Sequence, residues 1–229
     1  MELYTVLRTT FAARDFTDDP LPDETLYKIL NNARFAPSGG NRQGWRVLVV
    51  RDRATREALA ALTVPAAKRY MAQVQAGENP WNTIDPTRVD AGTIERTLVP
   101  VRMTEPVLRA AVVLLLCVDL KVVASTDQDL DRVGVVSGAS IYPFAWSMLL
   151  AARHEGFGGT ITTLAVAQEP KLRELLGIPR HVAVCAIMPL GRPVKQLKKL
   201  KRKIVPEFTM LERWGGQPLT ATTPRGGER

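Results

Sequence analysis

A run of nine apolar residues at positions 110–118 constrains the fold more than any other feature of the sequence. Such a run indicates a strand that is apolar on both faces and is therefore buried inside a sheet. Other elements must cover each face of that strand. Three further segments are predicted to be strands: residues 45–50, residues 181–190 and the threonine-rich residues 159–163.

Apolar residues at helical spacing predict the helices. One helix follows Pro22, repeats apolar residues over positions 26–33 and ends before Pro37. Another has Asp52 as its N-cap and continues through Leu62. Further helices are expected at residues 3–7, 134–152 and 169–176. Because these helices and strands follow one another without regular βαβ alternation, the sequence favours an α+β sandwich over a doubly wound fold.

The longest uncharged segment, residues 134–152, has the length of a membrane span. Its glycine, serine and proline residues make it too polar and too interrupted for lipid. We expect instead a helix that is buried on all sides, in the core or in a subunit interface. The first ten residues lack the apolar segment of a signal peptide, so a cytoplasmic protein with no membrane partner is expected.

The chain has 229 residues, of which 45% are hydrophobic, and this is enough for one substantial core. We expect a single domain over residues 1–219 and a flexible tail at residues 220–229. Proline and glycine interrupt residues 65–105, which predicts an irregular insertion within the domain. Such insertions often form lids or binding loops, and plain sequence variability is at least as common. In this insertion, Tyr70, Met71 and Trp81 could cover a substrate pocket or only pack it.

The positive charge of the chain is concentrated near its C-terminal end. Residues 195–203 account for six of the net +8 charges and contain no acidic residue. A basic run can be a solvated loop, a phosphate site or a contact for nucleic acid. Because no aromatic residue lies within the run, bases would have nothing to stack on, and nucleic acid is not the expected partner.

Few residues are available for acid–base or metal chemistry. The chain has two histidines and two cysteines, and both cysteines lie in apolar, strand-like segments. Neither the spacing of a zinc site nor the Gly-x-Ser-x-Gly elbow of a hydrolase is present. The remaining polar groups are arginines, amides, threonines and the basic run. This set suits a phosphorylated cofactor that brings its own reactivity.

An amide-rich loop lies between Pro37 and the strand expected at residues 45–50. Its glycines allow the backbone to approach a ligand closely, and Ser38, Asn41 and Gln43 supply donors and acceptors without charge. The same composition is typical of an ordinary turn. Local chemistry therefore leaves a ligand-binding loop and a simple turn as alternatives.

Several segments, taken in order along the chain, resemble the flavin-dependent nitroreductase family. Residues 36–45 are similar to the family signature Ala-Pro-Ser-x-x-Asn-x-Gln-x-Trp, with Gly44 where a proline is more usual. Residues 14–20 resemble its opening Arg/Lys-x-Phe pattern followed by proline. Later matches are found at residues 156–159, 175–179, 188–193 and 213–215. The resemblance spans about residues 3–216.

The resemblance implies a three-layer α/β/α sandwich with a mixed, mainly antiparallel sheet, assembled as a homodimer with two active sites in the subunit interface. It implies FMN as cofactor and NADH or NADPH as electron donor. A small-molecule electron acceptor, such as a nitroaromatic or a quinone, would then be reduced in a ping-pong hydride mechanism. No side chain is expected to be an obligatory catalytic acid or base, because the cofactor carries the chemistry.

The resemblance also assigns cofactor-binding residues. Arg14 matches a cation near the flavin ring and ribityl chain. The loop that reaches the flavin, often from the partner subunit, is matched by Pro37, Ser38, Gly39 and Asn41, together with Gln43. The strand whose donors meet the N5 and O4 edge of the ring is matched by Gly159, Thr162 and Thr163. The C-terminal cations that bind the phosphate are matched by Lys201 and Arg202.

One part of the family pattern is altered. The family has an arginine and a serine shortly before the position of Arg14, where this chain has Thr10, Phe11 and Ala12. Arg8, one helical turn away, is a candidate to replace the missing phosphate contact.

Two alternatives to a nitroreductase-like reaction stay open. One is another FMN reaction on the same fold: reductive dehalogenation, enone reduction or flavin fragmentation. The other is a protein that binds nucleic acid or an acidic partner through the basic run at residues 195–203.

Overall fold

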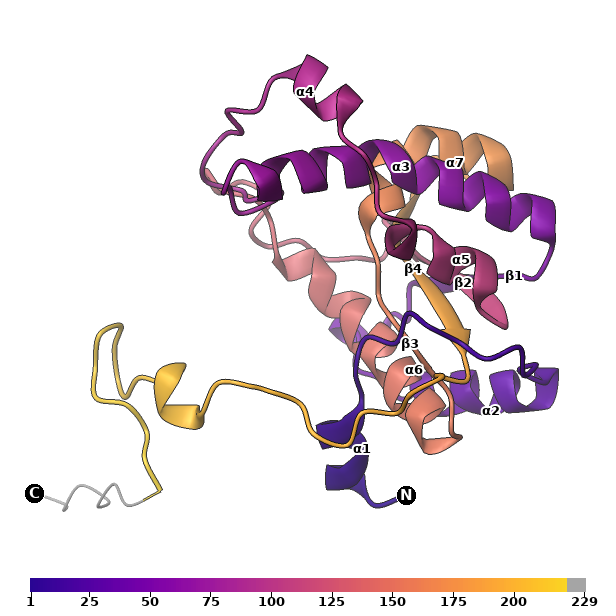
Figure 1. Ribbon diagram of the computed structural model, residues 1–229. Helices are drawn as coiled ribbons and strands as arrows, with labels where there is room; N and C mark the ends of the chain where they lie inside the picture. Colours follow the sequence, from indigo (N-terminus) through magenta and orange to yellow (C-terminus); the bar gives the residue numbers. More distant parts are fainter. Residues whose placement is uncertain (222–229) are drawn as a thin grey trace, which may run out of the picture. The chain divides into compact units, whose positions relative to one another are not determined.

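The computed structural model of the protein describes residues 1–221, and these belong to two compact units. The first unit is Met1–Leu197, and the second begins at Lys198 (Figure 1). Residues 222–229, which make up most of the tail expected at 220–229, lie outside the described residues. The single domain expected over residues 1–219 stays a prediction.

The first unit combines helices with a small sheet. Its helices are α1 (Leu3–Thr9), α2 (Asp23–Ala33), α3 (Arg53–Gln75), α4 (Ala91–Arg96), α5 (Glu105–Arg109), α6 (Tyr142–His154) and α7 (Glu169–Leu176). Its strands are β1 (Trp45–Val50), β2 (Val112–Asp119), β3 (Gly158–Gly159) and β4 (Val182–Gly191). Short 3-10 helices are η1 (Gly39–Asn41), η2 (Val101–Met103), η3 (Val136–Ser140) and η4 (Leu164–Gln168). The second unit contains the 3-10 helix η5 (Val205–Glu207).

The sheet has the strand order β1-β2-β4-β3, and every neighbouring pair of strands is antiparallel. Val47 pairs with Leu116 across β1 and β2, and Leu114 pairs with Met188 across β2 and β4. The expected mainly antiparallel pairing is confirmed, whereas the named strands include no parallel pair that would make the sheet mixed. A parallel pairing does occur outside them, as an isolated bridge between Ala12 and Gly159.

Strand β2 is buried on both faces, as its apolar run predicts. Val112, Leu114 and Leu116 face the core formed with α2 and α6. Val113 and Leu115 alternate with them and face the core formed with α3, α5 and α7. The sheet thus lies between helices on both sides, with α3, α5 and α7 on one side and α2 and α6 on the other (Figure 1). The α+β class is confirmed.

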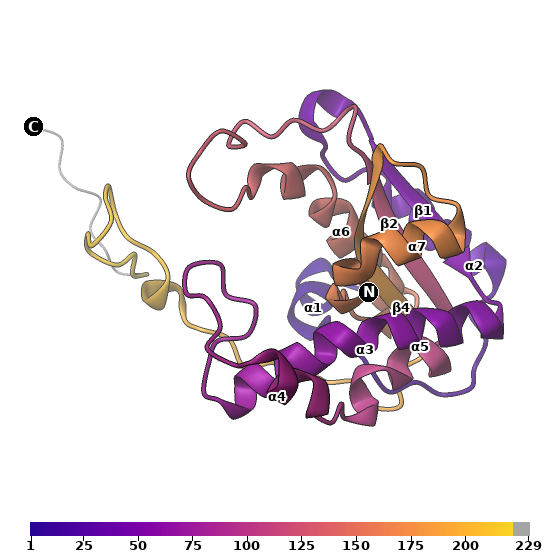
Figure 2. The same cartoon turned by 90° about the horizontal axis from the view of Figure 1, so that it is seen from above.

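Helix α3 is longer than expected. Asp52 caps its N-terminus, since its carboxylate accepts a hydrogen bond from the Thr55 N–H at 2.8 Å. The helix does not end at Leu62 but continues through Pro65 to Gln75. The first part of the expected insertion at residues 65–105 is therefore helical. Beyond it, α4 returns beside α3 (Figure 2).

The uncharged segment at residues 134–152 contains two elements, since η3 precedes α6. Helix α6 is not buried on all sides, because Tyr142 is 43% and Trp146 is 40% exposed. Its other face packs Phe144 and Met148 into the core. Within residues 1–221, none of the helices has both the length and the apolarity that crossing a membrane requires.

Candidate functional site

A cavity of about 940 Å³ opens in the first unit between α3, η2, the start of α6 and the segment after β3. Its apolar and aromatic wall includes Tyr70, Met71, Trp81, Met103 and Tyr142. Its polar wall includes Arg14, Arg102, Thr160, Thr162 and Thr163. A largely apolar hollow with a few convergent polar groups is typical of a small-molecule site.

A β-bulge in β4 shapes the floor of the cavity. The register between β2 and β4 shifts so that Leu116 pairs with Ala186 and Cys117 pairs with Val184. Cys185 has no partner on β2, and its carbonyl accepts a hydrogen bond from the Tyr142 hydroxyl at 3.3 Å. Bulges bend a strand and redirect its neighbours, and they are common beside functional sites.

Thr162 is held in place by Ile187, which lies two residues beyond the bulged Cys185. Its N–H donates to the Ile187 carbonyl at 2.9 Å, and the Ile187 N–H donates to the Thr162 carbonyl at 2.8 Å. The backbone of Thr162 is thus occupied, and its hydroxyl is the group it can offer to a ligand. The expected strand at residues 159–163 is shorter than predicted, because β3 ends at Gly159 and Thr162 forms only an isolated bridge.

Gly159 joins the N-terminal segment to the sheet. Its carbonyl accepts a hydrogen bond from the Ala13 N–H at 2.9 Å, which places Arg14 beside the same cavity. A β-carbon at Gly159 would collide with the carbonyl oxygen of Pro189. Glycine is therefore required by packing here, and Gly159 itself does not line the cavity.

The loop from Pro37 to Gln43 is ordered by its own side chains. The Ser38 hydroxyl accepts a hydrogen bond from the Gln43 N–H at 3.0 Å, and the Gln43 side-chain amide donates to the Asn41 side-chain oxygen at 3.1 Å. Asn41 and Gln43 have φ values of 51° and 49°, which are uncommon for residues other than glycine. Such backbone strain is often found at functional sites. The loop does not line the cavity of its own chain.

The other predicted cations are Arg8 in the first unit and Lys201 and Arg202 in the second. Arg8 lies on α1 with its guanidinium 5.7 Å from the centre of the Tyr4 ring. Lys201 and Arg202 belong to the second unit, where the Arg202 side chain donates to the Lys201 carbonyl at 2.8 Å. The roles of these three residues stay predictions.

Arg102 and Tyr142 are cavity residues that the sequence reasoning missed. Arg102 is the middle residue of η2, and Tyr142 is the first residue of α6. Neither residue belongs to a sequence motif. Tyr142 lies in the uncharged segment at residues 134–152, and Arg102 lies in the insertion expected at residues 65–105. Tyr70, Met71 and Trp81 do line the cavity. Their role as a lid stays a prediction.

The cavity has positive charge and no group suited to acid–base work at neutral pH. Arg14 and Arg102 are the charged side chains among its described lining residues. Burial raises the pKa of the Cys185 thiol to about 12, and burial also raises the pKa of Tyr142. Both side chains are therefore protonated at neutral pH.

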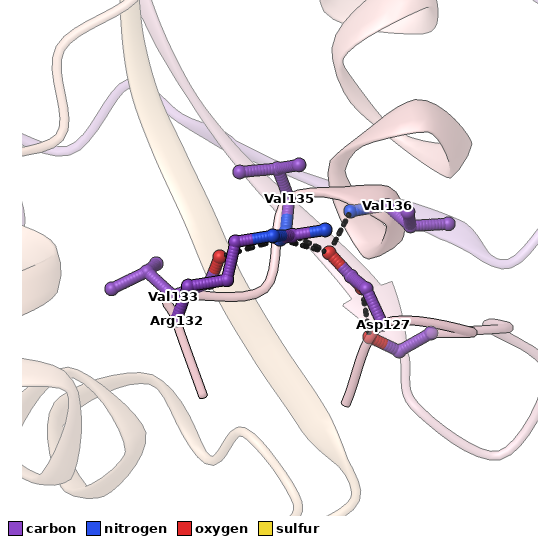
Figure 3. A network of polar contacts seen from close by, with 6 residues as sticks. Asp127, Arg132, Val133, Val135 and Val136 are labelled. Carbon is purple, nitrogen blue, oxygen red and sulfur yellow. Dashed lines mark hydrogen bonds and ion pairs between the residues drawn. The ribbon is translucent and has the colours of Figure 1, made fainter. Parts of the chain in front are cut away.

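The segment that leads to the cavity wall is fixed by the buried carboxylate of Asp127 (Figure 3). One carboxylate oxygen accepts from the Val135 N–H and from Arg132, each at 2.7 Å, and from the Val136 N–H at 3.3 Å. The other accepts from the Ser125 hydroxyl at 3.2 Å. These bonds, the Val135 N–H above all, hold the pKa of Asp127 far below its usual range. The network immobilises the chain just before η3.

Comparison with known proteins identifies relatives of this chain. The sequence profile of the nitroreductase family matches residues 7–192. An NADH dehydrogenase from Thermus thermophilus is 28% identical over 189 residues, which cover 80% of this chain and 82% of that protein. Iodotyrosine deiodinase 1 from Pongo abelii is 24% identical over 213 residues, which cover 92% of this chain and 68% of that protein.

A solved structure shares the fold. It is an oxidised iodotyrosine deiodinase bound to FMN and 3-iodo-L-tyrosine, and it matches with a TM-score of 0.64 at 20% identity. The match covers 89% of this chain and 96% of that chain. At this identity the likeness establishes the architecture of the first unit and leaves the substrate open.

Proposed function

Because the chain belongs to the nitroreductase family of oxidoreductases, we propose that it binds FMN and uses NADH or NADPH to reduce a small, electron-poor molecule. Nitroaromatics and quinones are the proposed electron acceptors. One observation carries the proposal: Arg14 lines the same cavity as Thr162 and Thr163, which lie far from it in the sequence. These are three of the residues that the resemblance assigns to the flavin.

The residues around the cavity fit an FMN. The volume lies within the range of about 300–1,000 Å³ that is usual for ligand pockets. The hydroxyl of Thr162 is directed by the backbone pair with Ile187. Within residues 1–221, the backbone N–H of Thr163 has no hydrogen-bond acceptor, so this donor is available. Arg14 adds a cation, and within residues 1–221 its side chain makes one hydrogen bond, a long one of 3.3 Å to the Ala12 carbonyl.

When bound, FMN would supply the group that accepts and donates hydride. The side chains would bind and orient it. Arg14 would stabilise negative charge at the ring, and the donors of Thr162 and Thr163 would fix one ring edge. Trp81 and Met103 would keep water away from the reacting face. Neither Cys185 nor Tyr142 is proposed as an acid or base, because both stay protonated over the working pH range.

We further propose that the phosphate is bound by Arg8, Lys201 and Arg202. A phosphate monoester carries roughly −1.5 to −2 charges at neutral pH, so several cations form a natural receptor.

The loop from Pro37 to Gln43 is proposed to contact the flavin of a second subunit. Its side chains bond one another, and none of its residues lines the cavity of its own chain. A homodimer would give this strained and exposed loop a ligand.

The proposal is tested by the anaerobic absorption spectrum of the purified protein, reconstituted with FMN, before and after addition of NADH or NADPH. We expect bound flavin whose visible absorbance is lost with at least one donor and returns with a nitroaromatic or quinone. Protein that takes up no FMN would contradict the proposal. Arg53→Met, far from the cavity, serves as the control variant, because the Arg53 side chain is 93% exposed.

Reductive dehalogenation is the second candidate, because two of the similar proteins are deiodinases. Turnover of halogenated phenols, measured by halide release beside nitroaromatic reduction, separates the two reactions.

A further inference from the structure

We propose that Arg102 selects electron acceptors that carry an anionic group, such as a carboxylate, on the electron-poor ring. The inference rests on the proposed function, because it concerns the substrate of the same cavity. It adds a residue that neither the sequence signature nor the family resemblance assigned.

The first support is the charge of the cavity wall. Its described lining residues include two cations, Arg14 and Arg102, and no carboxylate. If Arg14 binds the flavin, Arg102 is left as the cation that faces the second ligand. Within residues 1–221, Arg102 forms no hydrogen bond or ion pair, whereas nine of the other seventeen arginines of the first unit are bonded to a backbone carbonyl or a carboxylate. Of the arginines that lack such a bond, Arg102 is the one among the described lining residues of the cavity. A guanidinium without a partner at an apolar cavity is suited to an anion that arrives with the substrate.

The second support is the way the backbone holds Arg102. It lies in the turn η2, which is closed by bonds from the Met103 N–H to the Pro100 carbonyl at 2.9 Å and from the Thr104 N–H to the Val101 carbonyl at 3.0 Å. The next helix, α5, is anchored by buried Pro106 and Val107. The long side chain therefore extends from a fixed base and loses less freedom when a ligand binds.

The third support is the apolar surface next to the charge. Met103 and Pro106 line the cavity beside Arg102, and Trp81 and Tyr70 add aromatic surface. An aromatic ring can pack on these residues while its carboxylate meets the guanidinium. A planar guanidinium binds a carboxylate through two parallel hydrogen bonds, which gives orientation as well as affinity.

The same wall disfavours a zwitterionic amino acid. Its described lining residues offer no carboxylate for an ammonium group, and two arginines would repel that group. The substrate class therefore differs from 3-iodo-L-tyrosine, which is bound in the related deiodinase structure. A halogenated or nitrated aromatic acid without an amino group matches the positive charge of these lining residues better.

The experiment compares three acceptors of similar shape: 4-nitrobenzoate, 4-nitrobenzamide and 4-nitrobenzylamine. The readout is the ratio of kcat/KM for the benzoate to kcat/KM for the benzamide, so a general loss of activity or a difference in ring reactivity cancels between variants. In Arg102→Met we expect this ratio to fall by about 10-fold or more, the usual effect of losing a charge-assisted pair. Arg102→Lys should restore part of it, and Arg102→Glu should favour the benzylamine.

The matched control is Arg53→Met, which removes the same charge from an exposed position at the start of α3. It should leave the ratio unchanged. A ratio that stays within about twofold in Arg102→Met overturns the inference. A loss confined to the half-reaction with NADPH also overturns it, because Arg102 would then bind the phosphate of the electron donor.

A binding measurement separates this inference from the proposed function. Calorimetric titration of the protein with 4-nitrobenzoate needs no turnover, and its Kd should rise by a similar factor in Arg102→Met. Protein that is not reduced by NADH or NADPH would contradict the proposed function, yet this shift in Kd would still support Arg102 as an anion site. An unchanged Kd would overturn the inference even in an active enzyme.

Discussion

Thr162 and Ile187 form a reciprocal antiparallel pair with N–O distances of 2.9 and 2.8 Å, and Ile187 lies two residues beyond Cys185, where β4 bulges. The pair ties the segment after β3 to the central sheet, although β3 itself has only two residues. It also decides which atoms of Thr162 can meet a ligand. With the backbone N–H and carbonyl both used, the hydroxyl is the remaining group.

The hydroxyl of Thr162 can be tested separately from its backbone. Thr162→Val keeps the branched shape and the pair with Ile187, so the free energy of unfolding should be nearly unchanged. FMN affinity should fall by about 2–10-fold, the range for one neutral hydrogen bond. Flavin fluorescence titration measures the Kd, and Thr25→Val on α2 is the control. An unchanged FMN affinity would mean that the Thr162 hydroxyl does not contact the cofactor.

Gly159→Ala should destabilise the first unit. The added methyl group meets the Pro189 carbonyl, which belongs to a central strand and cannot move without disturbing the sheet. We expect a loss of about 1–3 kcal/mol or more in the free energy of unfolding. Gly39→Ala is the matched control, because its β-carbon would lie 3.6 Å from the nearest neighbour, the Ser140 hydroxyl. Denaturation in urea compares the two, and equal stabilities would contradict the expected collision.

The Asp127 network predicts a pH dependence of stability. The pKa of Asp127 is lowered in the folded state from an ordinary value of 3.8, so its bonds stabilise the fold fully above that pH. The contribution declines as the pH falls below about 4, because the carboxylate of the unfolded chain is protonated first, and it is lost when the folded-state carboxylate is protonated at a much lower pH. The difference in Tm between the wild type and Asp127→Asn should therefore be largest near neutral pH and shrink in acid.

Asp129→Asn is the control for that series, since Asp129 is exposed in the same segment. It should show no comparable difference at any pH. If the Tm difference for Asp127→Asn stayed constant from pH 7 to pH 3, the stabilisation would not depend on the charge of the Asp127 carboxylate.

Both cysteines should be unreactive in the folded protein. Burial raises the pKa of Cys117 to about 11 and that of Cys185 to about 12. At pH 8 the reactive thiolate is then on the order of one in a thousand molecules or fewer. Ellman's reagent should label neither thiol quickly in the native protein and should label both after unfolding in guanidinium. Rapid labelling of native Cys185 would show that the cavity wall opens.

Local sequence patterns were enough to locate core elements such as β2 and the start of α3. The apolar run of β2 and the N-cap at Asp52 were recognised because each depends on neighbouring residues only. Helix α3 was cut short at Leu62 because Pro65 ends an isolated helix, whereas packing of Ala66, Ala67 and Ala72 in the buried interior sustains it here. Local propensity cannot include that tertiary contribution.

The site was only partly foreseeable for a similar reason. Arg14 and Thr162 stood out through the family resemblance, and the structure brings both to one cavity. The strand over residues 159–163 was overestimated because threonine favours strands, while the pairing available to it is set by the bulge in a distant segment. Arg102 carries no local signature, and only the folded chain shows that it lines the cavity and that, within residues 1–221, it forms no ion pair.

Pro65 has a further consequence for helix α3. Proline has no N–H, so the carbonyl of Ala61 receives no helical hydrogen bond, and the ring crowds it. On one side of this gap, Leu59 is anchored in the core, and on the other, Tyr70 and Met71 form the cavity wall. We therefore expect α3 to open as two segments that meet at Pro65. In an amide hydrogen-exchange experiment, the part of α3 after Pro65, which includes Tyr70 and Met71, should exchange while the part before Pro65, which includes Leu59, stays folded.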